Sequence, residues 1–199
     1  MMSKFNSVFA LATAAAFIFG GVSSAAAAVL DVSNVSGNWT GLTSDPSHVP
    51  SNVTGLNTNS VSWGTPHATS KTGRQSGYSF VGAAAGQIES DTDFDLGTFT
   101  HRNFVINSGT SITGAGLGLV VNMVIGGVGR ALTTAFNFRH DETNNFGEAN
   151  GLCKNGNANG AGVNSAGCAD HVTILDNTAQ QDTIEIAGFL YIQIGRAFV

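Results

Sequence analysis

The stretch that decides the fold is Ile112-Thr113-Gly114-Ala115-Gly116-Leu117-Gly118-Leu119-Val120-Val121-Asn122-Met123-Val124-Ile125-Gly126-Gly127-Val128. It carries no charge, so a membrane span is the first alternative. It has only 17 residues, however, with five glycines and Asn122 near its middle, and a spanning helix needs about 20 apolar residues. The larger apolar side chains recur with the period of two that is typical of a β-strand. We therefore expect a long core strand, with one face made of Leu117, Leu119, Val121, Met123 and Ile125.

Shorter segments with a similar pattern lie on both sides of this strand. We expect strands at residues 38–42, 61–64, 77–82, 94–100, 135–142, 172–175, 183–186 and 189–194, and a long loop at 43–60. Residues 83–90 remain ambiguous, and no segment after residue 28 has the pattern of an amphipathic helix of ten residues. The predicted fold class is all-β: an antiparallel, jelly-roll-like β-sandwich of about 8–10 strands. A closed barrel is the nearest alternative.

The composition excludes several classes of protein. The chain has 199 residues, of which 26 are Gly and 11% are charged, against roughly a quarter charged in an average soluble domain. A net charge of −5 with only eight scattered basic residues excludes a nucleic-acid partner. The 42% hydrophobic content with 13 Phe argues against a disordered chain.

Residues 1–28 have the three parts of a secretory signal peptide. Lys4 is followed by an apolar run at residues 8–19 and by a small-residue segment at 23–28. We expect a signal helix that is cleaved, and one domain at residues 29–199 with no stable membrane span. An uncleaved anchor is disfavoured because the apolar run is too short. The protein is thus expected to be exported, to the extracellular space, the cell surface or the periplasm.

The two cysteines agree with export. Cys153 and Cys168 bracket a Gly- and Asn-rich loop, and such a pair is expected to form a disulfide in an oxidising compartment. Closing a loop of this length contributes about 3 kcal/mol in the chain-entropy model. Free thiols are the alternative. A zinc site is less favoured because the pair lacks the close spacing of structural zinc ligands.

Two polar segments are candidate binding sites. The first segment contains Thr100, His101 and Asn103, and the second contains His140, Glu142 and Asn144. His140 and Glu142 share one face of a strand by alternation, so both side chains can reach one ion. The structural alternative is that His and Asn hydrogen-bond to backbone groups that the end of a strand leaves unpaired.

A third candidate consists of spaced acidic residues: Asp91, Asp93 and Asp95. Positions six and twelve of an EF-hand counted from Asp91 hold Leu96 and Arg102 rather than Gly and Glu, which excludes that motif. A looser calcium site stays open. No Gly-x-Ser-x-Gly or His-Glu-x-x-His motif is present, so we expect a protein that is not an enzyme.

Four segments together resemble a bacterial family. They are Val61-Ser62-Trp63-Gly64-Thr65-Pro66, Gln75-Ser76-Gly77-Tyr78-Ser79-Phe80, Leu96-Gly97-Thr98-Phe99-Thr100-His101-Arg102-Asn103-Phe104-Val105-Ile106 and Phe136-Asn137-Phe138-Arg139-His140-Asp141-Glu142-Thr143-Asn144. Their order and spacing are similar to those of the choice-of-anchor K domain and the overlapping THxN family of PEP-CTERM proteins. The resemblance covers residues 37–194 and rests most on Trp-Gly and Thr-His-x-Asn.

This resemblance implies location more than chemistry. Those families are exported bacterial proteins with a β-rich domain, often tethered to the envelope, and no activity is firmly attached to them. The chain departs from the pattern because no Pro-Glu-Pro tail follows Asp182. The resemblance also implies a further strand beyond residue 194, which leaves open that the domain is incomplete at its C-terminus.

The sequence therefore predicts an exported, non-catalytic protein with a structural, adhesive or glycan-binding role in the envelope or matrix. Its expected partner is an envelope or matrix polysaccharide or protein. The alternative is a module that binds a small ligand or a metal ion, with calcium as one option, through the Thr-His-x-Asn and His-x-Glu-Thr segments.

Overall fold

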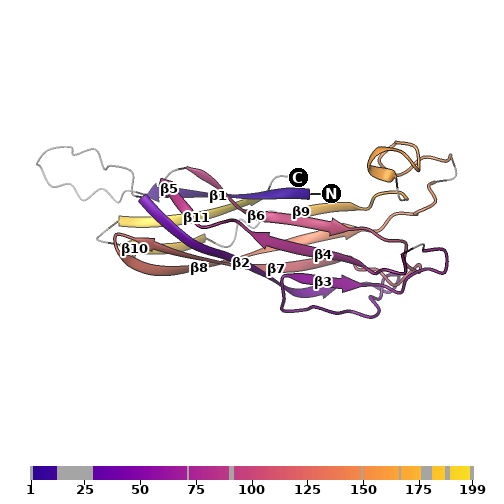
Figure 1. The fold of residues 1–199 in the computed structure, drawn as a ribbon, viewed down its shortest axis with the longest axis horizontal. Coiled ribbons are helices and arrows are strands. Elements are labelled where there is room, and N and C mark those ends of the chain that lie inside the picture. Colours follow the sequence, from indigo (N-terminus) through magenta and orange to yellow (C-terminus); the bar gives the residue numbers. More distant parts are fainter. Residues whose placement is uncertain are drawn as a thin grey trace, which may run out of the picture.

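The fold was obtained as a computed structural model, which describes residues 2–12, 29–70, 72–89, 92–148, 150–165, 167–175, 181–186 and 189–197. The strands run along the long axis of the molecule (Figure 1). They form two antiparallel sheets, so the predicted all-β sandwich-like fold is confirmed. Among the described residues, no helix has the length and apolar character needed to cross a membrane.

The first sheet has six strands in the order β10-β11-β1-β6-β4-β3. Their bounds are Gln181–Ile186 (β10), Phe189–Ala197 (β11), Met2–Ala12 (β1), Asp93–Arg102 (β6), Ser76–Gly82 (β4) and Ser60–Trp63 (β3). The second sheet has five strands in the order β5-β2-β7-β8-β9. Their bounds are Gly86–Glu89 (β5), Val29–Thr43 (β2), Gly114–Ile125 (β7), Val128–Asp141 (β8) and His171–Leu175 (β9).

The long apolar stretch forms β7, as the period of two predicts. Residues Leu117, Leu119, Val121, Met123 and Ile125 are all buried. The hairpin that joins β7 to β8 turns at Gly126 and Gly127, where φ is +57° and +80°. Glycine adopts such angles without the steric cost of a side chain. The turn fixes the register of β8, which directs Phe136, Phe138 and His140 into the interior.

The N-terminal segment differs from the expectation of a helix. Residues Met2–Ala12 form β1, which pairs with β6 on one side and with β11 on the other. A short apolar run is compatible with either a helix or a strand, and two neighbouring strand edges favour the strand. Residues 13–28 lie outside the described residues. Cleavage of the signal peptide and export remain predictions.

The core between the sheets is rich in aromatic side chains. Trp39 of β2 packs against Tyr78 of β4, with ring centroids 5.1 Å apart, and against Phe138 of β8 at 5.3 Å. Phe99 of β6 lies 5.0 Å from Phe138. The rings in these pairs are tilted to one another. The contacts join strands of both sheets, and aromatic pairs contribute to stability beyond the area that they bury.

Gly37 of β2 marks a point where the core leaves no room for a side chain. A Cβ atom there would lie 2.5 Å from side-chain carbons of Leu119 and Phe80. Gly37→Ala is expected to lower the free energy of unfolding by about 1–3 kcal/mol, because the core must shift to admit the methyl group. Urea denaturation measures the change. Gly41→Ala is the matched control on the same strand, because no atom lies within 4 Å of a Cβ there. An equal loss in both variants would contradict this account.

Candidate metal centre

Two strands from opposite sheets bring two histidines together. His101 lies two residues after the buried Phe99 on β6, and His140 two residues after the buried Phe138 on β8. Alternation therefore directs both imidazoles inward. Their ring centroids are 5.3 Å apart with an interplanar angle of 88°. Both residues are buried, at 8% and 4% relative exposure.

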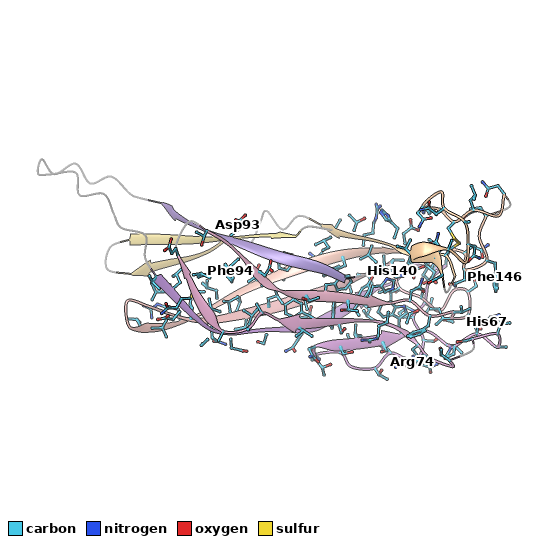
Figure 2. The ribbon with its side chains drawn as sticks, turned by 45° about the horizontal axis from the view of Figure 1, so that its top comes forward. His67, Arg74, Asp93, Phe94, His140 and Phe146 are labelled. Carbon is cyan, nitrogen blue, oxygen red and sulfur yellow. A yellow bond between two sulfur atoms is a disulfide. The ribbon has the colours of Figure 1, made fainter. Side chains whose placement is uncertain are left out.

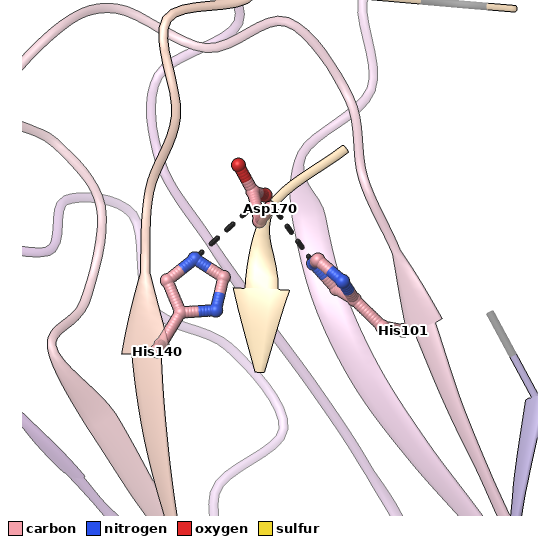
Figure 3. A group of neighbouring side chains, drawn as sticks. All are labelled: His101, His140 and Asp170. Carbon is pink, nitrogen blue, oxygen red and sulfur yellow. Dashed lines mark ion pairs between the residues drawn. The ribbon is translucent and has the colours of Figure 1, made fainter. Parts of the chain in front are cut away.

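Asp170 completes a cluster with these histidines. It comes just before β9 and its side chain is fully buried. Its Oδ2 lies 3.6 Å from His101 Nε2 and 3.8 Å from His140 Nε2, as the dashed lines in Figure 3 mark. The ligand atoms of the three residues all lie within 4.8 Å of one another. Two ligands of a tetrahedral zinc ion, with bonds of about 2.0–2.1 Å, are about 3.3 Å apart. A small contraction of this cluster would thus admit an ion.

The polypeptide around Asp170 is fixed by three independent contacts. The backbone N–H of Thr143 donates to Asp170 Oδ1 at 2.9 Å. The amide of Asn103 donates to the carbonyl of Cys168 at 3.1 Å. Cys168 is joined to Cys153 by a disulfide, which confirms that predicted bond. The Thr-His-x-Asn segment therefore supplies one candidate ligand, His101, and one residue, Asn103, that positions the segment carrying another.

Two atoms of the cluster lack a hydrogen-bond partner. Among the described residues, His101 Nε2 and Asp170 Oδ2 are buried and form no hydrogen bond, and the 3.6 Å between them is too long for one. Buried polar atoms are usually satisfied, because an unpaired one costs about 1–3 kcal/mol. An ion bound between these two atoms would satisfy both.

Burial also shifts the protonation of the cluster. Burial, reinforced by the nearby charge of Glu142, raises the pKa of Asp170 to about 7. Burial, reinforced by His140, lowers the pKa of His101 to about 3. In the absence of an ion, both groups are therefore neutral in mildly acidic solution. Neutral imidazole is the form that binds metal ions, whereas the carboxyl group must first lose its proton.

Tyr78, Glu142 and Ser111 surround the cluster. The Tyr78 hydroxyl lies 2.6 Å from Nδ1 of His140. When His140 binds an ion through Nε2, its Nδ1–H can donate to this hydroxyl, as the outer partners of metal-bound histidines commonly accept. Glu142 Oε2 lies 3.4 Å from His140 Nε2 and accepts a hydrogen bond of 2.5 Å from Ser111. Glu142 is thus near enough to supply a fourth ligand after a small movement.

A cavity of about 700 Å³ lies against the cluster. Two of the three candidate ligands, His101 and Asp170, line it, together with Asn103, Thr143, Lys154, Asn155, Val163, Gly167, Ala169 and His171. Ligand pockets commonly have volumes of about 300–1,000 Å³. The cavity is therefore large enough to hold a small molecule beside the cluster, whose ligand atoms His101 Nε2 and Asp170 Oδ2 are themselves buried.

The predicted site residues divide into those inside and those outside the cluster. His101 and His140 are candidate ligands, and Asn103 and Glu142 adjoin them. Thr100 alternates with His101 on β6 and is half-buried. Asn144 accepts a hydrogen bond from the backbone N–H of Phe146, so it stabilises a turn. Asp170, which with His171 lies beside Cys168, is only a weaker candidate from the sequence, and the structure brings it into the cluster.

The acidic candidates lie elsewhere. Asp93 and Asp95 are exposed on β6, and Figure 2 shows Asp93 well away from His140 along the long axis. Within the part of the chain that the structure describes, neither belongs to a group of three or more metal-ligating side chains. Asp91 lies outside the described residues. The calcium site at these positions stays a prediction.

Comparison with known proteins adds no family to this picture. No protein-family model matches the chain, and no curated protein shows significant similarity to it. The resemblance to the choice-of-anchor K and THxN families stays a prediction.

Proposed function

We propose that this protein is an exported β-sandwich protein that binds a divalent transition-metal ion through His101, His140 and Asp170. The observation that carries the proposal is the pair of unpaired, buried ligand atoms, His101 Nε2 and Asp170 Oδ2, with His140 Nε2 beside them. This proposal takes up the second function expected from the sequence, a binding module in which the Thr-His-x-Asn and His-x-Glu segments form one site.

The ligand set favours zinc over calcium. Two imidazole nitrogens and one carboxylate are typical of zinc and of other late transition metals. Calcium takes six to eight oxygen ligands, and this cluster offers few. Three protein ligands leave the fourth position of a tetrahedral ion to Glu142 or to a small ligand from the cavity beside His101 and Asp170.

Cobalt(II) titration is the direct test, because tetrahedral cobalt has visible absorption bands and follows zinc chemistry. We expect one equivalent to bind, with competition by zinc. His101→Asn should weaken binding at least tenfold, because it removes one of three ligands. His67→Asn, at a half-buried histidine outside the cluster that contacts Thr69, is the matched control and should bind as the unaltered protein does. Unchanged affinity in His101→Asn, with the fold retained by circular dichroism, would refute the proposal.

The expected role in the envelope or matrix is compatible with this site. A bound ion would tie together β6, β8 and the segment before β9, and so would stiffen one end of the sandwich. We assign no catalytic step to the centre, and the expectation that the protein is not an enzyme stays a prediction.

A further inference from the structure

A second candidate site lies on the side of β6 opposite the metal centre, and its residues have no role in that centre. Arg102 follows His101 directly, so alternation directs it away from the core. Its side chain and that of Arg74 line a cavity of about 480 Å³ with Ser62, Gly73, Gln75 and Phe104. Figure 2 shows Arg74 at the outside of the molecule.

The guanidinium of Arg102 is held in one orientation. Its Nη2 lies 3.1 Å from Ser60 Oγ, 3.3 Å from the carbonyl of Val61 and 3.4 Å from Ser62 Oγ. Gly77 leaves the space for this group, because a Cβ there would lie 2.6 Å from Nη2. Among the described residues only Nη2 forms such contacts, so Nη1 and Nε retain N–H groups for a ligand. Both parallel N–H pairs of a guanidinium include Nη2, so Nη1 and Nε can each donate a single hydrogen bond to an oxyanion rather than a bidentate pair.

Arg74 adds a second positive charge to the same cavity. Its guanidinium lies 5.2 Å from the centre of the Phe104 ring, within the range of a cation–π contact. Among the described residues, neither arginine forms an ion pair with a carboxylate. Burial and then the charge of Arg74 lower the pKa of Arg102, which is the sign expected for two cations without an anion between them.

Gln75 offers the cavity a hydrogen-bond acceptor. Its Nε2 donates to the carbonyls of Asn52 and Gly64, at 2.8 and 2.9 Å. Its Oε1 has no partner among the described residues and is an acceptor. Inorganic sulfate has no hydrogen to donate to this oxygen, whereas a sugar ring carries hydroxyl groups beside its acidic group.

We propose that the cavity of Arg74, Arg102 and Gln75 binds the carboxylate or sulfate group of an acidic saccharide. Arg102 holds the oxyanion with its free N–H groups, Arg74 adds charge, and Gln75 Oε1 accepts a hydrogen bond from a neighbouring sugar hydroxyl. This site lies on the opposite side of β6 from the metal centre and does not depend on it. The cavity is thus our proposed site for the glycan binding that the sequence predicts.

Binding of an oligogalacturonate, measured by isothermal titration calorimetry at low salt, tests the proposal. Arg74→Gln should weaken binding at least tenfold, and salt should weaken it in the unaltered protein because screening acts on exposed charges. Arg130→Gln, at an exposed arginine of β8, is the matched control. Arg102→Lys keeps the charge but loses the guanidinium that the contacts of Nη2 hold in place, and it should also weaken binding.

Three outcomes would overturn the proposal. They are equal binding by Arg74→Gln, equal binding of a neutral oligosaccharide, and inorganic sulfate binding as tightly as the oligogalacturonate. Cobalt(II) titration of Arg74→Gln separates the two sites, because its metal affinity should not change. Loss of saccharide binding with intact metal binding supports the inference even if the metal centre has another role.

Discussion

Zinc or cobalt affinity at the His101–His140–Asp170 centre is expected to fall by about fiftyfold between pH 7 and pH 5. The cause is Asp170, whose pKa burial raises to about 7. Below that pH the carboxyl group holds a proton that an ion must displace, so each pH unit costs a factor of about ten in affinity from this group alone. His101, with a pKa of about 3, stays neutral over this range and adds no further proton.

Calorimetry in buffers of different ionisation enthalpy measures the protons released on binding. At pH 6, Asp170 should contribute about one proton per metal ion. Asp170→Asn is the control, because it removes the titrating group; its remaining affinity should depend less on pH between 5 and 7. An affinity for the unaltered protein that is constant over this range would show that Asp170 is not a ligand or that it is already ionised.

The same two groups act on folding in opposite directions. The raised pKa of Asp170 contributes stability that is present below about pH 4 and is lost as the pH rises through 7. The lowered pKa of His101 contributes stability that is present above about pH 6.5 and is lost as the pH falls towards 3. Between these limits the two slopes cancel. The free energy of unfolding of the metal-free protein is thus expected to change little with pH around pH 5. Metal binding, in contrast, depends strongly on pH.

The strands were predictable from the sequence where alternation was long and unbroken. Strand β7 and the inward face of β8 follow from the period of two, and this alternation already directs His140 into the core. Strand β5 was ambiguous because its side chains are mostly exposed and its pairing with β2 lies at a sheet edge. A local pattern contains little information about such long-range pairing.

The candidate site was only partly predictable for the same reason. His101 and His140 stood out because polar residues interrupt apolar strands. Their meeting depends on how two sheets face each other, which no local spacing fixes. Asp170 lies in an irregular segment, and its position depends on Thr143 and on the disulfide. The pairing of Cys153 with Cys168 was predictable; its consequence for Asp170, two residues further on, was not.

Removing the disulfide is expected to lower the free energy of unfolding by about 3 kcal/mol and to weaken metal binding at least tenfold. The bond between Cys153 and Cys168 closes a loop with a sequence separation of 15. When this link is lost, the unfolded chain gains conformational entropy, which lowers the free energy of unfolding by this amount. Metal binding should weaken because the loop then releases the segment that carries Asp170. Cys153→Ser/Cys168→Ser, studied by urea denaturation and cobalt(II) titration, measures both effects.

Asn157→Ala, at an exposed position of the same loop, is the matched control and should change neither quantity by much. Comparing the unaltered protein before and after treatment with a dithiol reductant separates loss of the bond from the effects of substitution. A variant that loses stability but keeps its metal affinity would show that Thr143 and Asn103 alone position Asp170. In that case the disulfide would stabilise the fold without organising the metal centre. The hydrogen bond from Thr143 would already fix the Asp170 carboxylate, and the bond from Asn103 to the carbonyl of Cys168 would already hold the segment before it.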